Sequence, residues 1–309
     1  MTGKALSVLG EQALAPVSPL RPAGPVRAGA PARFFTLDAL QRAWLAVKRA
    51  GGGAGVDAVT LTTFAARLMD ELGRLREELA AGRYRPRPVR RVLVPKPNGG
   101  LRPLALWALR DRVAQRAVYD IIAPSFEATF LPCSFGYRPG LGAEDAVRQV
   151  LAYRDRNLRW VVDGDIQDCF DSIPADRLLG LVARRVEDPL LQQYISGWLE
   201  AQILNGVDGV PTKAGASQGS VLSPLLANIY LHEVDRLLVA RKLALVRYAD
   251  DLVICCARKT EAQAALAATN EALGAWGLQL NEHKTEIVHF DQGFAWLGYF
   301  LLRGECFRL

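Results

Sequence analysis

The feature that most restricts the fold of this chain is a pair of adjacent aspartates between two apolar segments. Residues 243–248 and 252–256 are predicted strands, and Ala249-Asp250-Asp251 is a predicted tight turn that joins them. The second segment is apolar throughout, so we expect it to be buried and to hold two like charges near a core. Because Asp is common in turns, an ordinary polar turn is the alternative to a functional one.

A second apolar segment also ends in carboxylates. Residues 160–166 are a predicted strand, on which Asp163 and Asp165 share a face because they are two positions apart. Mg²⁺ binds a few carboxylates and leaves its other positions for water and phosphates. Two such ions can activate a 3′-hydroxyl and neutralise a leaving pyrophosphate. Carboxylates from two strands could form such a platform, and spacing alone does not select between Asp163 and Asp165.

Positive charge is concentrated in one part of the chain. The net charge is +6, which alone is weak evidence for a polyanionic partner. Residues 83–116, however, include ten basic residues and a single acidic residue, Asp111. They are Arg83, Arg85, Arg87, Arg90, Arg91, Lys96, Arg102, Arg110, Arg112 and Arg116. Such a stripe is typical of a track for a phosphate backbone.

Composition excludes several classes of protein. The 309 residues are 50% hydrophobic, enough for a sizeable core. Five cysteines without paired metal spacing, together with three histidines, argue against a disulfide framework or a structural zinc site, and they favour a reducing cytoplasm. We find no run of about 18 apolar residues and no apolar leader, so the sequence predicts a cytoplasmic protein without membrane spans.

Strands and helices alternate along the rest of the chain. Predicted helices cover residues 37–50, with Thr36 as N-cap, and residues 63–81, 110–122, 174–185, 189–201, 223–242 and 260–276. Further predicted strands cover residues 90–95, 101–104, 285–290 and 296–301, and a turn at Pro97-Asn98-Gly99-Gly100 joins the first two. The pattern predicts an α+β fold with an antiparallel hairpin at its centre.

Together, these motifs resemble the reverse transcriptases. Tyr248-Ala249-Asp250-Asp251 is similar to their YxDD box, in the form typical of bacterial group II intron-type enzymes. Further segments recur in that family in the same order, across roughly residues 55–300. They include Val94-Pro95-Lys96-Pro97-Asn98-Gly99-Gly100-Leu101-Arg102-Pro103, Arg110-Asp111-Arg112, Ser134-Phe135-Gly136-Tyr137-Arg138-Pro139, Asp165-Ile166-Gln167-Asp168-Cys169-Phe170-Asp171, Gln218-Gly219-Ser220-Val221-Leu222-Ser223-Pro224, Leu280-Asn281-Glu282-His283-Lys284-Thr285 and Trp296-Leu297-Gly298-Tyr299.

The resemblance implies an α+β right-hand polymerase with fingers and palm, a central antiparallel sheet and no thumb. The expected division is a disordered Ala/Pro/Gly-rich tail (1–32), a helical extension of the fingers (33–90), the fingers and palm (91–302) and a C-terminal tail (303–309). The implied activity is RNA-directed DNA polymerase. Only eleven residues follow Gly298, too few for a thumb, so we expect a fragment or a partner that grips the duplex.

The resemblance also assigns roles. Asp165, Asp250 and Asp251 are the expected ligands of two Mg²⁺ ions, for which Mn²⁺ could substitute, with help from the backbone carbonyl of Ile166; Lys284 is expected to protonate pyrophosphate. Lys96 and Arg102 bind the nucleotide triphosphate, Phe170 is the steric gate, and Gln218-Gly219 contacts the template–nucleotide pair, although Ser217 stands where the family usually has Pro. Tyr248 and Trp296-Leu297-Gly298 contact the primer. The alternatives are solvated charges for the three basic residues and core aromatics for Phe170 and Tyr248.

The implied partners are an RNA template, a DNA or RNA primer and deoxynucleotides. The compact chain and residues 290–298 resemble CRISPR-associated reverse transcriptases, which work with the CRISPR adaptation integrase. An alternative is an RNA-binding or maturase-like scaffold, or a subunit of a complex, without independent polymerase activity.

Overall fold

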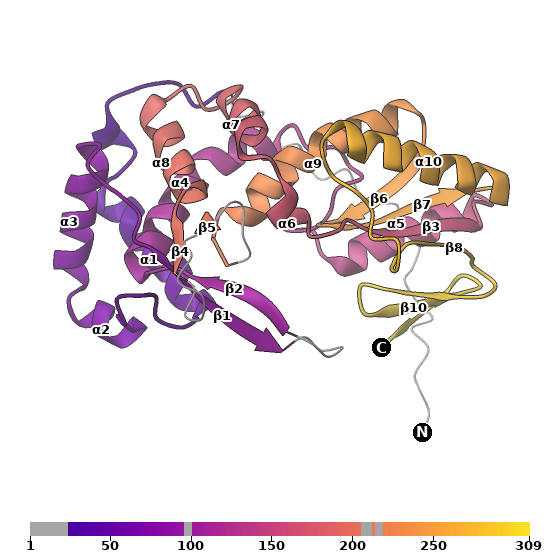
Figure 1. The fold of residues 1–309 in the computed structure, drawn as a ribbon, viewed down its shortest axis with the longest axis horizontal. Helices are drawn as coiled ribbons and strands as arrows, with labels where there is room; N and C mark the ends of the chain where they lie inside the picture. Colours follow the sequence, from indigo (N-terminus) through magenta and orange to yellow (C-terminus); the bar gives the residue numbers. More distant parts are fainter. Residues whose placement is uncertain (1–23, 96–100, 205–211, 214–218) are drawn as a thin grey trace. The chain divides into compact units, whose positions relative to one another are not determined.

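The chain forms two compact units, each discontinuous in sequence (Figure 1). Unit 1 contains Phe130–Ser172 and Tyr230–Leu309, and unit 2 contains Ile173–Ile229 and the described residues before Phe130. The structure, a computed structural model, describes residues 24–95, 101–204, 212–213 and 219–309, with the backbone alone for 101–103, 202–204 and 212–213. The expected division into continuous ranges differs from these units, because the chain leaves unit 1 after Ser172 and returns at Tyr230.

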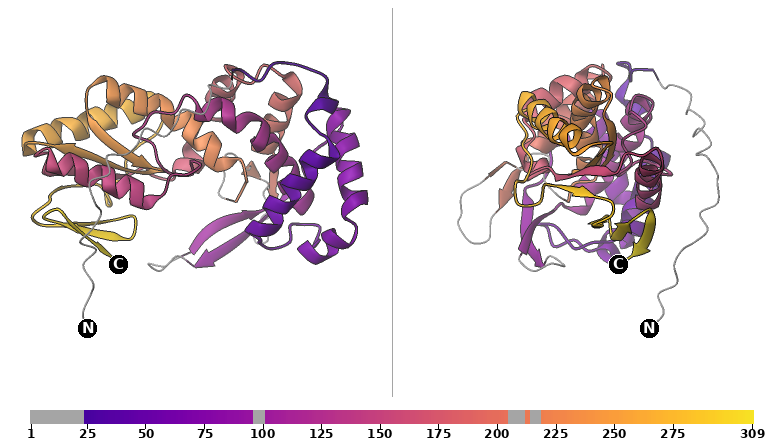
Figure 2. Two further views of the ribbon diagram at one scale, coloured as in Figure 1. Left: turned by 180° about the vertical axis from the view of Figure 1, so that it is seen from behind. Right: turned by 90° about the vertical axis from the view of Figure 1, so that its right-hand side faces the viewer.

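Unit 1 is built on a four-stranded sheet in the order β6-β7-β3-β8, with antiparallel neighbours throughout. The strands are β3 (Trp160–Asp165), β6 (Ala244–Tyr248), β7 (Asp251–Cys256) and β8 (Glu286–His289). Helix α10 (Lys259–Ala275) packs on β3 and β7, and α5 (Ala143–Asp155) packs on β6 and β7. The two helices cover opposite faces (Figures 1 and 2). The predicted central hairpin is therefore confirmed, and its strands lie between two helical layers.

The C-terminal residues of unit 1 form a second antiparallel sheet of β9 (Phe294–Trp296), β10 (Tyr299–Leu302) and β11 (Glu305–Arg308). The predicted strand over 296–301 is wrong, because Leu297 (φ 50°) and Gly298 (φ 78°) form a two-residue turn between β9 and β10. Positive φ at both central residues is the requirement of a type I′ hairpin. The segment expected as a tail, 303–309, contains β11, which Arg303 and Gly304 join to β10 by a similar turn.

Unit 2 combines helices with a small sheet in the order β2-β1-β4-β5. Its helices are η1 (Pro31–Arg33), α1 (Leu37–Ala50), α2 (Leu61–Ala66), α3 (Leu68–Ala80), α4 (Leu109–Glu127), α7 (Ala175–Ala183) and α8 (Pro189–Leu199). Its strands are β1 (Val89–Pro95), β2 (Leu101–Leu106), β4 (Gln202–Leu204) and β5 (Thr212–Lys213). Helices α6 (Cys169–Ser172), in unit 1, and α9 (Ser223–Ala240), which continues into unit 1, complete the fold.

Helix α1 matches its prediction, and Thr36 caps it by accepting a hydrogen bond from the Ala39 N–H at 3.1 Å. The predicted helix over 63–81 is wrong, because Arg67 (φ −122°) separates α2 from α3. This break lets Phe64 stack on Trp44, with ring centroids 4.9 Å apart, while α3 buries its own leucines. Helix α4 also continues past its predicted end, through Pro124 to Glu127.

Of the tail that was expected to be disordered (1–32), the structure describes residues 24–32. Val26 pairs with Val186: its N–H donates to the carbonyl of Arg185 at 2.7 Å, and its carbonyl accepts from Glu187 at 2.8 Å. Over the described part of the chain, no helix combines the length and the apolar character that crossing a membrane requires.

Candidate active site

Three aspartates meet at one end of the main sheet of unit 1. Asp165 ends β3 and lies opposite Asp251, the first residue of β7, in the antiparallel register. Asp250 precedes Asp251 in the turn after β6, and its carbonyl accepts a hydrogen bond from the Ile166 N–H at 3.1 Å. The structure thus brings together the three carboxylates that the sequence pointed to.

Burial and mutual repulsion make Asp250 and Asp251 hard to ionise. Burial, followed by the charges of Asp250 and Asp165, raises the pKa of Asp251 to about 7. Burial also raises the pKa of Asp250. Asp163 belongs to the same group, because burial and then the charges of Asp251, Glu286 and Asp165 raise its pKa to about 7. A cluster of this kind fits a divalent cation, which would offset the repulsion among several carboxylates.

Lys284 is the cation next to this cluster. Its Nζ donates to both carboxylate oxygens of Asp165, at 3.0 and 3.1 Å, and its side chain is 62% exposed. The hydrogen bond to Asp165 raises the pKa of Lys284, so the amine stays protonated. Among the residues that the structure describes, no three His, Cys, Asp or Glu side chains are arranged as a ready metal site, and Lys284 occupies the Asp165 carboxylate. A metal ion bound there would therefore compete with Lys284.

Lys284 reaches Asp165 because the chain before it adds to the sheet. Leu280 forms a bridge with Ile166, and the Asn281 N–H donates to the Asp165 carbonyl at 2.8 Å. The turn that follows carries Lys284. The predicted roles of Lys284 as proton donor and of the Ile166 carbonyl as a metal ligand stay predictions.

The predicted sugar and primer contacts also lie in unit 1. Phe170, on α6, is 8% exposed. Tyr248 is half-buried and packs against a hydrophobic cluster that contains Trp296, itself only 4% exposed. Leu297 and the exposed Gly298 form the β9–β10 turn. Burial fits both readings of the aromatic residues, as contacts or as core, so their roles stay predictions.

Four residues were predicted to bind the triphosphate or the template–nucleotide pair, and the structure describes two of them at least in part. Lys96 and Gln218 lie outside the described residues, and of Arg102 only the backbone is described, opposite Val94 in the β1–β2 hairpin. Gly219 is described: its φ is 112°, and a Cβ atom there would lie 2.2 Å from the carbonyl oxygen of Ala105. The loop therefore approaches β2 so closely that this position requires glycine.

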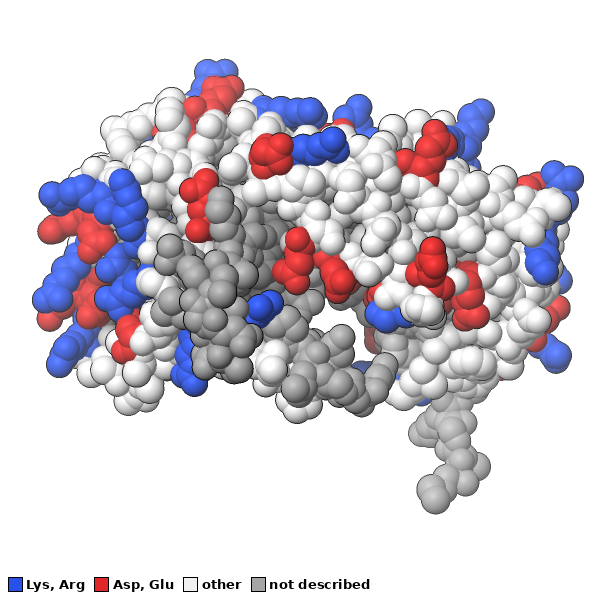
Figure 3. Space-filling view, viewed as in Figure 1, with Lys and Arg blue, Asp and Glu red and all other residues white. Residues whose placement is uncertain are grey.

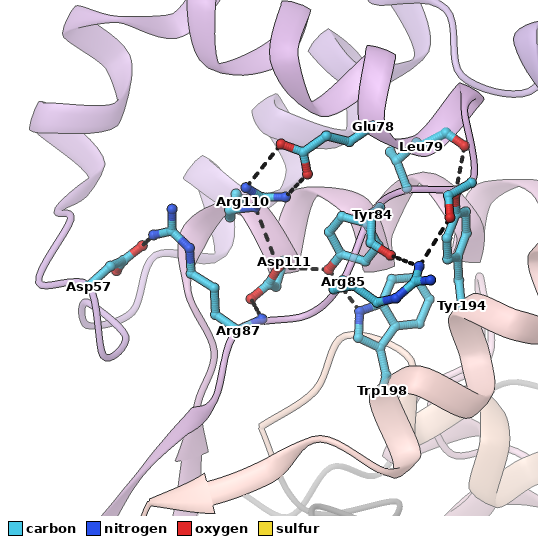
Figure 4. Close-up of polar contacts among 11 residues, drawn as sticks. Asp57, Glu78, Leu79, Tyr84, Arg85, Arg87, Arg110, Asp111, Tyr194 and Trp198 are labelled. Atoms are coloured by element: carbon cyan, nitrogen blue, oxygen red, sulfur yellow. Dashed lines mark hydrogen bonds and ion pairs between the residues drawn. The ribbon is translucent and has the colours of Figure 1, made fainter.

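Part of the basic stripe is structural. Arg87 pairs with Asp57 and Arg110 with Glu78 (Figure 4). Arg112 donates to the carbonyls of Gly51 and Gly53 at 2.7 and 2.9 Å. On α3, which precedes the stripe in the sequence, Figure 3 shows basic and acidic side chains intermingled. Within the stripe itself, ion pairs and hydrogen bonds already engage Arg87, Arg110 and Arg112. The stripe is thus less available to phosphates than the sequence suggested, whereas Arg83, Arg85, Arg90 and Arg91 are exposed.

Comparisons with known proteins identify the family of this chain. The family profile described as "Reverse transcriptase (RNA-dependent DNA polymerase)" matches residues 94–301. The chain is 35% identical over 288 residues to protein YkfC of Escherichia coli strain K12, covering 81% of this chain and 76% of that protein. It is 35% identical over 175 residues to the group II intron-encoded protein LtrA of Lactococcus lactis subsp. cremoris, covering 56% of this chain but 29% of LtrA.

One solved structure shares the fold of this chain. An apo telomerase from Candida tropicalis, truncated from its C-terminal domain, has a TM-score of 0.50 at 14% identity and covers 72% of this chain and 55% of that chain. A partial Cas6-RT-Cas1–Cas2 complex has a TM-score of 0.44 at 25% identity and covers 79% of this chain and 41% of that chain.

Proposed function

This chain belongs to the reverse transcriptases, the RNA-dependent DNA polymerases, and from that membership we propose that it extends a primer with deoxynucleotides at Asp165, Asp250 and Asp251 by a two-metal mechanism. The observation that carries the proposal is the meeting of these carboxylates at the end of β3 and β7. When bound there, two Mg²⁺ ions would activate the primer hydroxyl and neutralise the leaving pyrophosphate.

The protein's own part in this reaction is to hold charges in place. Asp165 and Asp251 lie on paired strands, and the Ile166 N–H donates to the Asp250 carbonyl, so the backbone that carries the three carboxylates is held in place before cations bind. Lys284 stays protonated beside Asp165 and is placed in this proposal as the proton donor to the pyrophosphate.

The remaining roles extend the proposal to both units. We assign the palm to unit 1 and the fingers to unit 2. Lys96, Arg102, Gln218 and Gly219 would bind the nucleotide and its template base, and Phe170 would exclude the ribose 2′-hydroxyl. Tyr248, Trp296, Leu297 and Gly298 would hold the primer, which is DNA or RNA on an RNA template.

Primer extension tests the catalytic assignment. With poly(rA) as template, an oligo(dT) primer and Mg²⁺, Asp250→Asn should lower the extension rate on the order of 10³-fold, as expected when several kcal/mol of charge stabilisation is lost. Template–primer affinity, measured by fluorescence anisotropy, should change little. Asp155→Asn, at an exposed carboxylate at the end of α5, is the matched control and should keep the wild-type rate. An Asp250→Asn variant that retains the wild-type rate would refute the proposed site.

Sugar selectivity tests Phe170. Phe170→Ala should raise incorporation of ribonucleotides relative to deoxynucleotides, because the ring would no longer occupy the space of the 2′-hydroxyl. Phe64→Ala removes a buried ring from unit 2 and controls for general loosening. If competition assays show the same selectivity in Phe170→Ala as in the wild type, Phe170 is a core residue and not a gate.

The biological setting is a separate proposal. Similarity to LtrA supports a group II intron-type enzyme, although the chain covers 29% of LtrA. The resemblance of residues 290–298 supports a CRISPR-associated enzyme that works with an adaptation integrase. Co-purification of the tagged chain with a co-expressed integrase would favour the second setting, and its failure would favour the first.

A further inference from the structure

An arginine is buried directly behind the aspartate turn. Arg247, the penultimate residue of β6, has a side chain only 2% exposed, and Asp235 on α9 is equally buried. The two side chains form a bidentate ion pair, in which Nε and Nη2 of Arg247 donate to Oδ1 and Oδ2 of Asp235, both at 2.7 Å. This pairing fixes the plane of the guanidinium group.

The same guanidinium holds the turn itself. Its Nη1 donates to the carbonyl of Ala249 at 2.9 Å, and its Nη2 donates to the Ser134 hydroxyl at 2.9 Å. Ala249 has a φ of 59°, in the left-handed region that is unfavourable for residues other than glycine. The residue that precedes both catalytic aspartates is therefore held in an unfavourable conformation, and Arg247 binds its carbonyl.

A neighbouring segment packs against the turn from the same part of unit 1. The Phe135 N–H donates to the Arg247 carbonyl at 2.8 Å, and the Arg247 N–H donates to the Cys133 carbonyl at 2.7 Å. A Cβ atom on Gly136 would lie 2.3 Å from the Ala249 nitrogen. The turn thus has little room to move on that side.

Stability alone gives a poor account of this arrangement. A buried ion pair is often no more stabilising than well-packed apolar side chains of similar volume, because both charges lose their hydration. An apolar pair, however, could not donate a hydrogen bond to Ala249. The hydrogen bond that requires the guanidinium group is therefore the one to the Ala249 carbonyl in the turn.

We propose that Arg247, oriented by Asp235 and Ser134, is a positioning residue that fixes the Ala249-Asp250-Asp251 turn in the geometry needed for catalysis. The inference rests on the proposed function of Asp250 and Asp251. Arg247 acts through the backbone of Ala249, and its contribution is to the placement of the carboxylates.

The test replaces the ion pair by apolar residues. In the double variant Arg247→Met with Asp235→Leu no charge is left unpaired, so the melting temperature should stay near that of the wild type. We expect the kcat of primer extension to fall on the order of 10²-fold, the size expected for a misplaced catalytic group, with little change in KM for the deoxynucleotide. Mn²⁺ affinity, measured by electron paramagnetic resonance, should fall on the order of tenfold.

Two further variants keep the proposal testable. Arg241→Met with Glu271→Leu removes an exposed pair of the same unit, 2.9 Å apart, and should leave kcat and Mn²⁺ affinity unchanged. If the buried double variant does not fold, Arg247→Lys serves instead. Lysine keeps the positive charge but lacks the planar guanidinium group that binds Asp235 and Ala249 at the same time. Wild-type kcat and Mn²⁺ affinity in whichever folded variant is measured would overturn the positioning role. Full activity in Asp250→Asn would instead overturn the proposed function.

Discussion

Asp111 makes the stability of the protein depend on pH in a way that the structure allows us to calculate. Its side chain is fully buried on α4. The carboxylate accepts hydrogen bonds from the Tyr84 hydroxyl at 2.7 Å and from the Arg87 N–H at 3.0 Å (Figure 4). Burial outweighs these contacts and the nearby arginines, and it raises the pKa of Asp111 to about 6, against 3.8 in an unfolded chain.

The sign follows from which state binds the proton more tightly. Because the pKa of Asp111 is higher in the folded state, the fold loses stability as the pH rises from 3.8 to about 6, and the full cost is present above that pH; protonation relieves the cost as the pH falls. The full difference between 3.8 and about 6 corresponds to roughly 3 kcal/mol. About 1.3 kcal/mol of it is expressed between pH 7 and pH 5.

Urea unfolding of the wild type and of Asp111→Asn at pH 5, 6 and 7 measures this effect. Asp163 and Asp251 also have raised pKa values and titrate alike in both proteins, so the difference between the two isolates Asp111. On going from pH 7 to pH 5, the wild type should gain about 1.3 kcal/mol more than Asp111→Asn. Tyr84→Phe should move the transition to higher pH, because it removes a hydrogen bond that lowers the pKa of Asp111. Equal pH dependence in the wild type and Asp111→Asn would refute the reasoning.

Two further predictions concern stability. Asp188→Ala should lower the free energy of unfolding by about 1–2 kcal/mol, because Asp188 caps α8 by accepting from the N–H groups of Leu190 and Leu191 and also accepts from the Gly29 N–H. Urea unfolding measures the loss, and a loss in Asp188→Ala no larger than that in Asp188→Asn would contradict the prediction. Gly219→Ala should lower stability by about 1–3 kcal/mol, since its Cβ would meet the Ala105 carbonyl at a φ of 112°; Gly73→Ala, in the open face of α3, is the control and should be neutral or stabilising.

The parts of the fold that the sequence predicted are those specified by local patterns. The segments that form β6 and β7 are separated only by the aspartate turn. Helix α1 begins directly after a capping threonine, Thr36. Such signals lie within a few residues of the structure they specify. Asp165 is different, because the choice between it and Asp163 came from family resemblance and not from spacing.

The errors fall where a local signal is weak or where tertiary contacts decide. The turn between β9 and β10 carries one glycine, Gly298, and needs positive φ at Leu297, which nothing in that residue predicts. Helix α5 was not predicted, although Asp145 caps it by accepting from the Gly142 N–H at 2.9 Å, and Ala146, Val147 and Val150 have helical spacing. The break at Arg67 accompanies the stacking of Phe64 on Trp44, a contact between residues that are distant in sequence.

Local patterns in the sequence could not predict which side chains pair with one another at the site, for a physical reason. Lys284 lies 119 positions from Asp165, and Ser134 lies 113 from Arg247. Pairings over such separations depend on the assembled sheet, not on neighbours in the chain. The sequence nevertheless indicates that Arg247 is unusual, because a charged residue inside an apolar strand must be paired in order to be buried. Its position beside the aspartate turn then restricts where that partner can act. A charge that interrupts an apolar strand next to a catalytic turn is therefore a testable sign of a residue that positions the turn.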